Sequence, residues 1–120
     1  MGSVSLDDIL VTSLKRIAVP GGDVLHAMKK SDSGYIGFGE AYLSLVEFGA
    51  VKAWKRHLQM TLNLIVPVGK VRFVFVDSAG SVKEVIAGEG HYVRLTVPPG
   101  IWFGFQGFSE GTALLLNIAN

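Results

Sequence analysis

Six clusters of turn-forming residues constrain the fold of this chain more than any other feature. They lie at residues 20–22, 31–34, 67–69, 77–80, 88–90 and 98–100. The clusters separate runs of roughly five to ten residues, a spacing typical of an all-β sandwich or barrel. The 15 glycines fit the same interpretation, because tight turns between short strands favour glycine.

The runs between these clusters have the composition of β-strands. We expect strands at residues 9–17, 41–48, 62–66, 71–76, 92–97 and 113–119. In residues 71–76 both faces are apolar apart from Arg72, which predicts a strand buried on both faces of a closed or flattened barrel. Residues 24–30 are either a short helix or another strand.

The composition excludes several classes of function. The chain has no cysteine, which removes disulfides, thiolate metal sites and cysteine nucleophiles. A net charge of +1 argues against nucleic-acid binding, and no apolar run approaches the roughly 20 residues of a membrane span. Without a linker, repeat or export signal, residues 1–120 are expected to form one cytoplasmic domain, and we assign no function to residues 1–3.

Two motifs resemble those of the cupin barrels. The first cupin motif, G-x5-H-x-H-x4-E-x6-G, matches at Gly49, His57 and Gly69, and the second matches at Pro98 and Gly100. Cupins that bind metal place ligands where this chain has Lys55, His57, Leu62 and Phe103. One imidazole cannot hold a transition metal alone, so the resemblance implies a barrel with no metal and no other cofactor.

Three sequence blocks resemble one metal-free branch of the cupins more closely. They are residues 51–57 (VKAWKRH), 63–71 (NLIVPVGKV) and 97–105 (VPPGIWFGF). The chain resembles the RmlC-like family, the dTDP-4-dehydrorhamnose 3,5-epimerases and the related dTDP-sugar ketoisomerases, over a core of approximately residues 34–119. This resemblance implies a double-stranded β-helix (cupin, jelly-roll) barrel and a homodimer formed through edge strands, for which residues 9–17 offer a strand.

The resemblance also implies a reaction, the transfer of a proton next to the C4 ketone of a dTDP-4-keto-6-deoxyhexose. The histidine that acts as the base in the epimerases aligns with Lys55, their lysine with Leu62 and a second histidine with Phe103. The tyrosine that acts as their acid lies beyond Asn120. The second histidine of the ketoisomerase His-x-His falls on His57. We therefore expect His57 to act as the base, since imidazole has an ordinary pKa of about 6.5, and Lys55 to stabilise the enolate.

Six further residues are candidates for substrate binding. Lys52 and Arg56 would hold a diphosphate, and the alternative is that they form an ordinary solvated edge of the sheet. Trp102 and Phe103 would contact a ring or else pack in the core. Tyr42 and Asn117 are polar residues whose strand positions allow them to point inward.

The sequence also allows a second function. Ile101, Phe103 and Phe105 share one strand face, so the lumen of the barrel would be strongly apolar. Such a lumen would suit a small hydrophobic or aromatic ligand better than a sugar. The alternative is therefore a non-catalytic cupin that binds a small apolar molecule.

Overall fold

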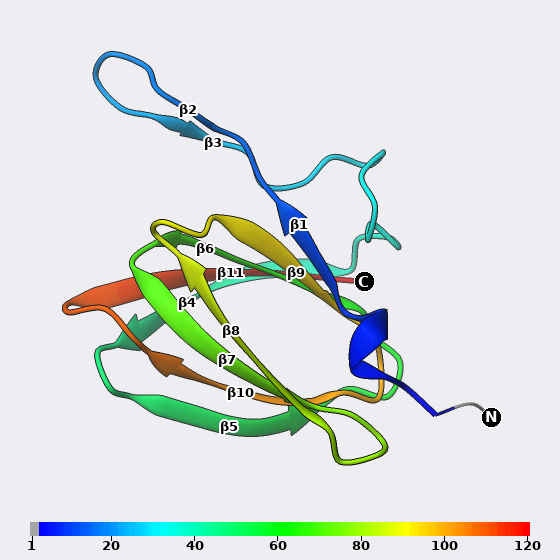
Figure 1. Cartoon of the computed structure of the whole chain (residues 1–120). Helices are drawn as coiled ribbons and strands as arrows, with labels where there is room; N and C mark the ends of the chain where they lie inside the picture. Colours follow the sequence, from blue (N-terminus) through cyan, green and yellow to red (C-terminus); the bar gives the residue numbers. More distant parts are fainter. Residues whose placement is uncertain (1–2) are drawn as a thin grey trace.

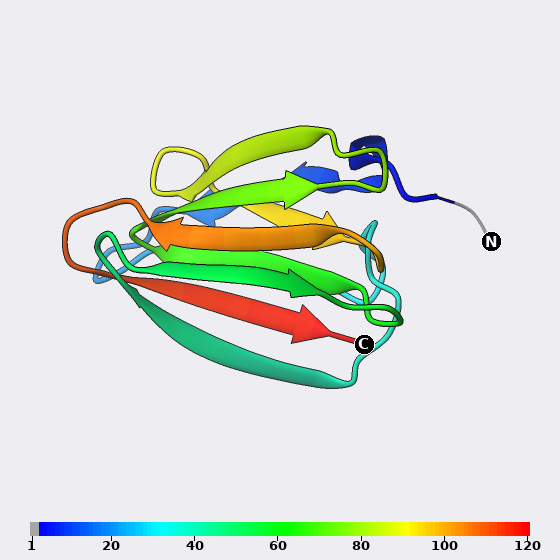
Figure 2. The same ribbon diagram turned by 90° about the horizontal axis from the view of Figure 1, so that it is seen from below.

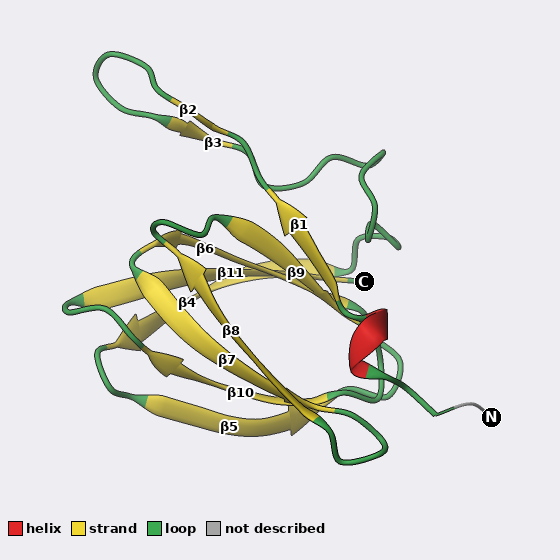
Figure 3. Ribbon diagram, in the orientation of Figure 1, coloured by secondary structure: helices red, strands yellow, loops and turns green. Residues whose placement is uncertain are grey.

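A computed structural model describes residues 3–120, so Met1 and Gly2 lie outside the described part. One short 3₁₀ helix, η1 (Leu6–Asp8), precedes a series of strands (Figure 3). The strands are β1 (Leu10–Ser13), β2 (Arg16–Ile17), β3 (Val24–Leu25), β4 (Glu40–Glu47), β5 (Val51–Arg56), β6 (Leu62–Val68), β7 (Lys70–Val76), β8 (Val82–Gly88), β9 (Val93–Val97), β10 (Trp102–Gly107) and β11 (Thr112–Ala119).

Two antiparallel sheets face each other and form the barrel (Figures 1 and 2). The larger sheet has the order β1-β9-β6-β11-β4, and the smaller has the order β5-β10-β7-β8. Strands β4 and β5 follow each other in the chain, and each is an edge strand of a different sheet. The predicted all-β jelly-roll fold of the cupin type is confirmed.

Aromatic side chains fill the space between the sheets. Phe73 and Phe75 of β7 are fully buried, and they pack against Phe105 and Phe103 of β10 with ring centroids 5.8 and 6.3 Å apart. Pairs at this separation stabilise a core beyond the area that they bury. The expected apolar lumen is therefore present, and side chains occupy most of it.

Burial on both faces occurs in β9 and in residues 62–66 of β6 rather than in β7. In β7 the outward side chains are only half-buried, whereas every residue of β9 is buried. The outer face of β9 carries Arg94 and Thr96, and the segment after β3 covers it. Arg94 donates to the carbonyl oxygens of Ala27 and Ser33, which attaches this segment to the sheet. The prediction for residues 71–76 was wrong because β7 has no such cover.

The N-terminal region differs from the single strand predicted at residues 9–17. Strand β1 pairs with β9 of the same chain, and the chain then enters a separate hairpin, β2–β3, that projects away from the barrel (Figure 1). Arg16 pairs with Asp23 across this hairpin at 2.8 Å. No helix forms at residues 24–30, because β3 pairs with β2 there instead.

Gly69 shows why the cupin glycines recur at corners of the barrel. It lies between β6 and β7 with a φ of 77°, a conformation that glycine adopts readily and other residues rarely do. An added Cβ would also come within 3.0 Å of the Ala113 Cα atom. A side chain at this corner would therefore strain the backbone and press against β11.

Candidate functional site

A small cavity at the mouth of the barrel brings together most of the polar residues expected to react. The cavity measures about 20 Å³, which is room for about one water molecule. Strands β4, β5, β6, β10 and β11 supply its walls, together with the residue that follows β5. Its lining residues are Tyr42, Ser44, Lys55, His57, Leu64, Phe103, Phe105, Leu115 and Asn117.

His57 and Lys55 line this cavity from the end of β5, as their spacing predicts. Lys55 lies opposite Phe103 in the β5–β10 register, and the His57 ring lies 6.3 Å from the Phe103 ring. The backbone N–H of Gly100 donates to the His57 carbonyl at 2.8 Å, which holds the backbone beside the imidazole. Lys55 is exposed and His57 is half-buried, so both side chains are accessible to a ligand at the mouth of the barrel.

Tyr42 and Asn117 face each other across the β4–β11 pair and form a polar couple in the same cavity. The Asn117 side-chain amide donates to the Tyr42 hydroxyl oxygen at 2.9 Å. Asn117 is only 5% exposed, and its Oδ1 atom has no hydrogen-bond partner. The Tyr42 oxygen therefore accepts one hydrogen bond and keeps its own O–H free to donate, while Asn117 Oδ1 offers a second polar atom.

Arg56 and Trp102 do not line this cavity. They lie opposite each other in the β5–β10 register, and the Arg56 guanidinium stacks over the Trp102 ring at 4.8 Å. Their neighbours Lys55 and Phe103 point into the barrel, and successive strand residues point to opposite faces. The structure thus places Arg56 and Trp102 on the outer face of the smaller sheet, in contrast to the expectation from sequence.

Lys52 points to the same side of β5 as Lys55, because both lie opposite inward-facing phenylalanines of β10. Residues three apart in a regular strand point to opposite faces, but a register shift in the β5–β10 pair lies between these two lysines and brings them to the same side. The Lys52 ammonium donates to the carbonyl oxygen of Leu45 on β4 at 3.4 Å. This long hydrogen bond spans the open side of the barrel and leaves Lys52 exposed.

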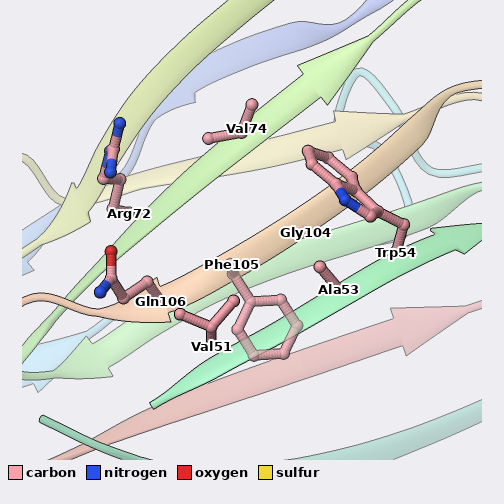
Figure 4. A pocket seen from close by; sticks show the side chains of 8 residues that line it. All are labelled: Val51, Ala53, Trp54, Arg72, Val74, Gly104, Phe105 and Gln106. Atoms are coloured by element: carbon pink, nitrogen blue, oxygen red, sulfur yellow. The ribbon is translucent and has the colours of Figure 1, made fainter. Parts of the chain in front are cut away.

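Two further hollows were not expected from the sequence. One is a groove of about 220 Å³ on the outer face of the smaller sheet, where Trp54, Arg72, Val74 and Gln106 surround Gly104 (Figure 4). The other measures about 420 Å³ and lies beside Arg94. A charged residue between apolar neighbours in residues 92–97 was the available signal for the second hollow, but sequence alone does not show what covers that face.

The described residues show no further kind of site. Within residues 3–120, no three or more His, Cys, Asp or Glu side chains gather in a way that could hold a metal ion. The same residues contain no helix long and apolar enough to cross a membrane. The absence of a metal from the functional form stays a prediction, which metal analysis of protein purified without chelator can test.

These features define the class of the protein as a cupin barrel with a histidine, a lysine and a tyrosine at the mouth of its lumen. A dTDP-sugar isomerase from Desulfovibrio desulfuricans G20 superposes with a TM-score of 0.90 and 33% identity, covering 94% of this chain and 76% of that one. A dTDP-4-dehydrorhamnose 3,5-epimerase from Sulfolobus tokodaii superposes with a TM-score of 0.81 and 20% identity, covering 99% of this chain and 74% of that one.

The chain belongs to the dTDP-sugar isomerase family, as its identity with the Desulfovibrio protein and the coverage of both chains show. A relative from Haloferax volcanii, described as a probable low-salt glycan biosynthesis epimerase, is 26% identical over 84 residues. That match covers 64% of this chain and 54% of the relative, so the chain spans about half the length of that protein. No family model matches the chain.

Proposed function

We propose that the protein is a metal-independent epimerase or ketoisomerase that moves a proton next to the C4 ketone of a nucleotide-linked 4-keto-6-deoxy sugar. The observation that carries this proposal is the convergence of His57, Lys55 and Tyr42 on one cavity. Support comes from the dTDP-sugar isomerase from Desulfovibrio desulfuricans G20, which is 33% identical in sequence to this chain and superposes on it with a TM-score of 0.90.

In the proposed reaction, His57 removes a proton from the carbon next to the ketone. The electron pair of the broken C–H bond moves toward the carbonyl carbon, and the ketone oxygen becomes an enolate oxygen. The Lys55 ammonium stabilises the negative charge on that oxygen, which is the usual role of a cation at such a site. The cavity is too small for a sugar ring, so the substrate lies at its mouth, where Lys55 and Tyr42 are exposed.

Tyr42 completes the reaction as the proton donor. Its oxygen accepts a hydrogen bond from Asn117, so its own O–H group is free to donate to the substrate. Return of the proton to the opposite face of the same carbon gives an epimer. Protonation at C4 after the proton of the neighbouring hydroxyl is transferred gives a ketoisomer. Lys52, on the same side of β5, is the proposed diphosphate contact.

The alternative function, a non-catalytic barrel for a small apolar ligand, has one observation in its favour. The cavity floor is aromatic, because Phe103 and Phe105 are buried directly beneath the polar residues. A ligand of this type would displace or move these rings. A screen of small aromatic compounds by thermal shift tests this function, and no stabilisation by any of them would count against it.

A homodimer in the cytoplasm is also part of the proposal, although the surface differs from the N-terminal strand expected from sequence. Leu43 and Leu45 of β4 lie opposite Leu116 and Leu114 of β11 on the outer face of the larger sheet. We call these four residues the leucine patch. Leu43 is 60% and Leu45 68% exposed, and grouped apolar exposure of this kind typically marks an interface.

Nuclear magnetic resonance in deuterium oxide tests the proposed function. The protein is incubated with dTDP-4-keto-6-deoxyglucose, and the sugar signals are followed over time. We expect the signal of a proton next to the ketone to disappear and signals of an epimer or ketoisomer to grow. A substrate spectrum that does not change beyond the enzyme-free control would overturn the proposal.

A further inference from the structure

We propose that the hollow beside Arg94 is a binding site for a small phosphate-bearing molecule, separate from the cavity of His57. The hollow lies between β1, the start of the β2–β3 hairpin and the segment that follows β3. Its volume is about 420 Å³, large enough for a phosphate or a diphosphate group. We call it the Arg94 hollow; its lining residues are Thr12, Ser13, Leu14, Lys15, His26, Lys29, Ser31, Asp32, Ser33 and Arg94.

The Arg94 guanidinium is the buried cation of this hollow. It is 1% exposed, and it donates to the carbonyl oxygens of Ala27 at 2.8 Å and Ser33 at 3.0 Å. Its contact with the Asp32 carboxylate is longer, at 3.4 Å, and its Nε–H group has no partner. A buried guanidinium is costly when its charge is incompletely compensated, so this side of the molecule favours a further anion.

Two exposed lysines add positive charge to the same hollow. Within the described residues, the ammonium groups of Lys15 and Lys29 have no carboxylate within ion-pairing distance, unlike Arg16 and Arg72. The hollow has a single carboxylate, that of Asp32, which already accepts the Lys29 backbone N–H at 2.7 Å as well as the Arg94 contact. The lining therefore carries an excess of positive charge in a chain whose total net charge is +1.

Hydroxyl groups surround these cations. Thr12, Ser31 and Ser33 line the hollow, and a serine or threonine hydroxyl can donate one hydrogen bond to an oxygen anion. Cations combined with several neutral donors are the chemistry that recognises phosphate groups. An isolated carboxylate would use fewer of these donors, so a phosphate or diphosphate matches the lining better.

The position of the hollow separates it from the proposed catalytic cavity. Val93, Leu95 and Val97 of β9 point into the core between the sheets, and Arg94 alternates with them and faces the opposite side. The larger sheet therefore stands between the Arg94 hollow and His57. A phosphate bound here would not contact the reacting sugar, and its binding does not depend on whether the protein is an isomerase.

Isothermal titration with pyrophosphate tests this inference on the intact protein, using a matched pair of lysine variants. Lys29 lines the hollow, whereas Lys30 is its exposed neighbour and does not. We expect Lys29→Ala to weaken pyrophosphate binding by about tenfold or more, since it removes one charge-assisted contact. The Lys30→Ala variant has the same net charge, and its affinity should match that of the wild type within about twofold.

Two further arms identify the source of the phosphate. Lys15→Ala should weaken pyrophosphate binding to the hollow as Lys29→Ala does, because Lys15 also lines it. Any binding at Lys52, the proposed diphosphate contact of the catalytic cavity, should persist in both variants. Titration with inorganic phosphate and with dTDP, each compared between wild type and Lys29→Ala, then shows whether one phosphate suffices at the hollow or a nucleotide is required there. The inference is overturned if wild-type protein does not bind pyrophosphate, if Lys29→Ala and Lys30→Ala lose affinity equally, or if Lys52→Ala alone abolishes all of the binding.

Discussion

At the scale of single residues, the hydrogen bond between Asn117 and Tyr42 positions the hydroxyl group that we propose as the proton donor at the barrel mouth. The sequence marks Asn117 as a polar break in an apolar strand and Tyr42 as an inward-facing residue. Their pairing depends on the β4–β11 register, which brings together residues 75 positions apart. Sequence patterns identify the face of each strand but not the partner across a long-range pair, so this couple could not be predicted.

Replacement of Tyr42 by phenylalanine tests its proposed role as the acid. We expect Tyr42→Phe to lower turnover by about 10²- to 10⁴-fold, because the positioned proton donor is lost. Proton removal by His57 should continue, so deuterium exchange into the substrate should fall much less than product formation. Parallel kinetic and exchange assays measure the two steps.

A control is needed because the substitution leaves the buried Asn117 amide without its acceptor, at a cost of about 1–3 kcal/mol in stability. Thermal melting of Tyr42→Phe shows how much of its loss is structural, and Tyr35→Phe provides a tyrosine outside the cavity. Wild-type product formation by a folded Tyr42→Phe variant would rule out Tyr42 as the acid.

At the scale of secondary-structure elements, the core strands follow the sequence closely and the N-terminal elements do not. Residues 62–66, 71–76 and 113–119 fall within β6, β7 and β11. The alternating or continuous apolar residues of these segments indicate strands and show which of their faces are buried. The region before residue 40 has weaker patterns and depends on distant partners. Strand β1 pairs with β9, and Arg94 fixes the segment after β3, two contacts that no local pattern contains.

Asp77 links two of these elements and gives the protein a specific sensitivity to acid. Its carboxylate accepts backbone N–H groups from Leu6 of η1 and from Ala79 and Ser81 of the β7–β8 turn. Partial desolvation raises the pKa of Asp77, but backbone hydrogen bonds, including these three, outweigh it and hold the pKa below its ordinary value. A carboxyl with a lowered pKa stabilises the folded state above its unfolded pKa of about 3.9, and this contribution disappears as the pH falls through the folded pKa.

The Asp77→Asn variant should therefore be less stable than the wild type at neutral pH, and the difference should shrink as the pH falls below about 4. Urea unfolding between pH 2.5 and 7 measures both curves. Glu110→Gln removes an exposed carboxylate from a different turn and should follow the wild type at every pH. A constant difference between Asp77→Asn and wild type across this range would contradict the assigned pKa direction.

At the scale of the whole molecule, the barrel leaves an apolar surface that a monomer would expose to water. The leucine patch on β4 and β11 is the clearest part of it, and the projecting β2–β3 hairpin lies on its own beyond the barrel. Sequence comparison with the family predicted the dimer, but not this surface. The exposure of the leucine patch depends on how the two sheets pack against each other, and the alternation of residues along a strand does not reveal that packing.

The proposed dimer predicts a mass of twice 12.9 kDa by light scattering at micromolar concentration. Leu43→Glu should shift the protein toward the monomer, because a charge in an apolar interface is costly to bury. Leu58→Glu makes the same change at an exposed position outside the leucine patch and should leave the mass unchanged. A wild-type mass of 12.9 kDa under these conditions would contradict the dimer.

The most direct test of the central claim, that His57 is the base of a sugar-nucleotide isomerase, is the rate of solvent deuterium incorporation next to the C4 ketone. The assay compares wild type, His57→Ala and His91→Ala, the last removing an imidazole that lies outside the cavity. The structure predicts that His57→Ala lowers the rate by about 10²- to 10⁴-fold and that His91→Ala retains it. Equal incorporation by wild type and a folded His57→Ala variant would contradict the claim.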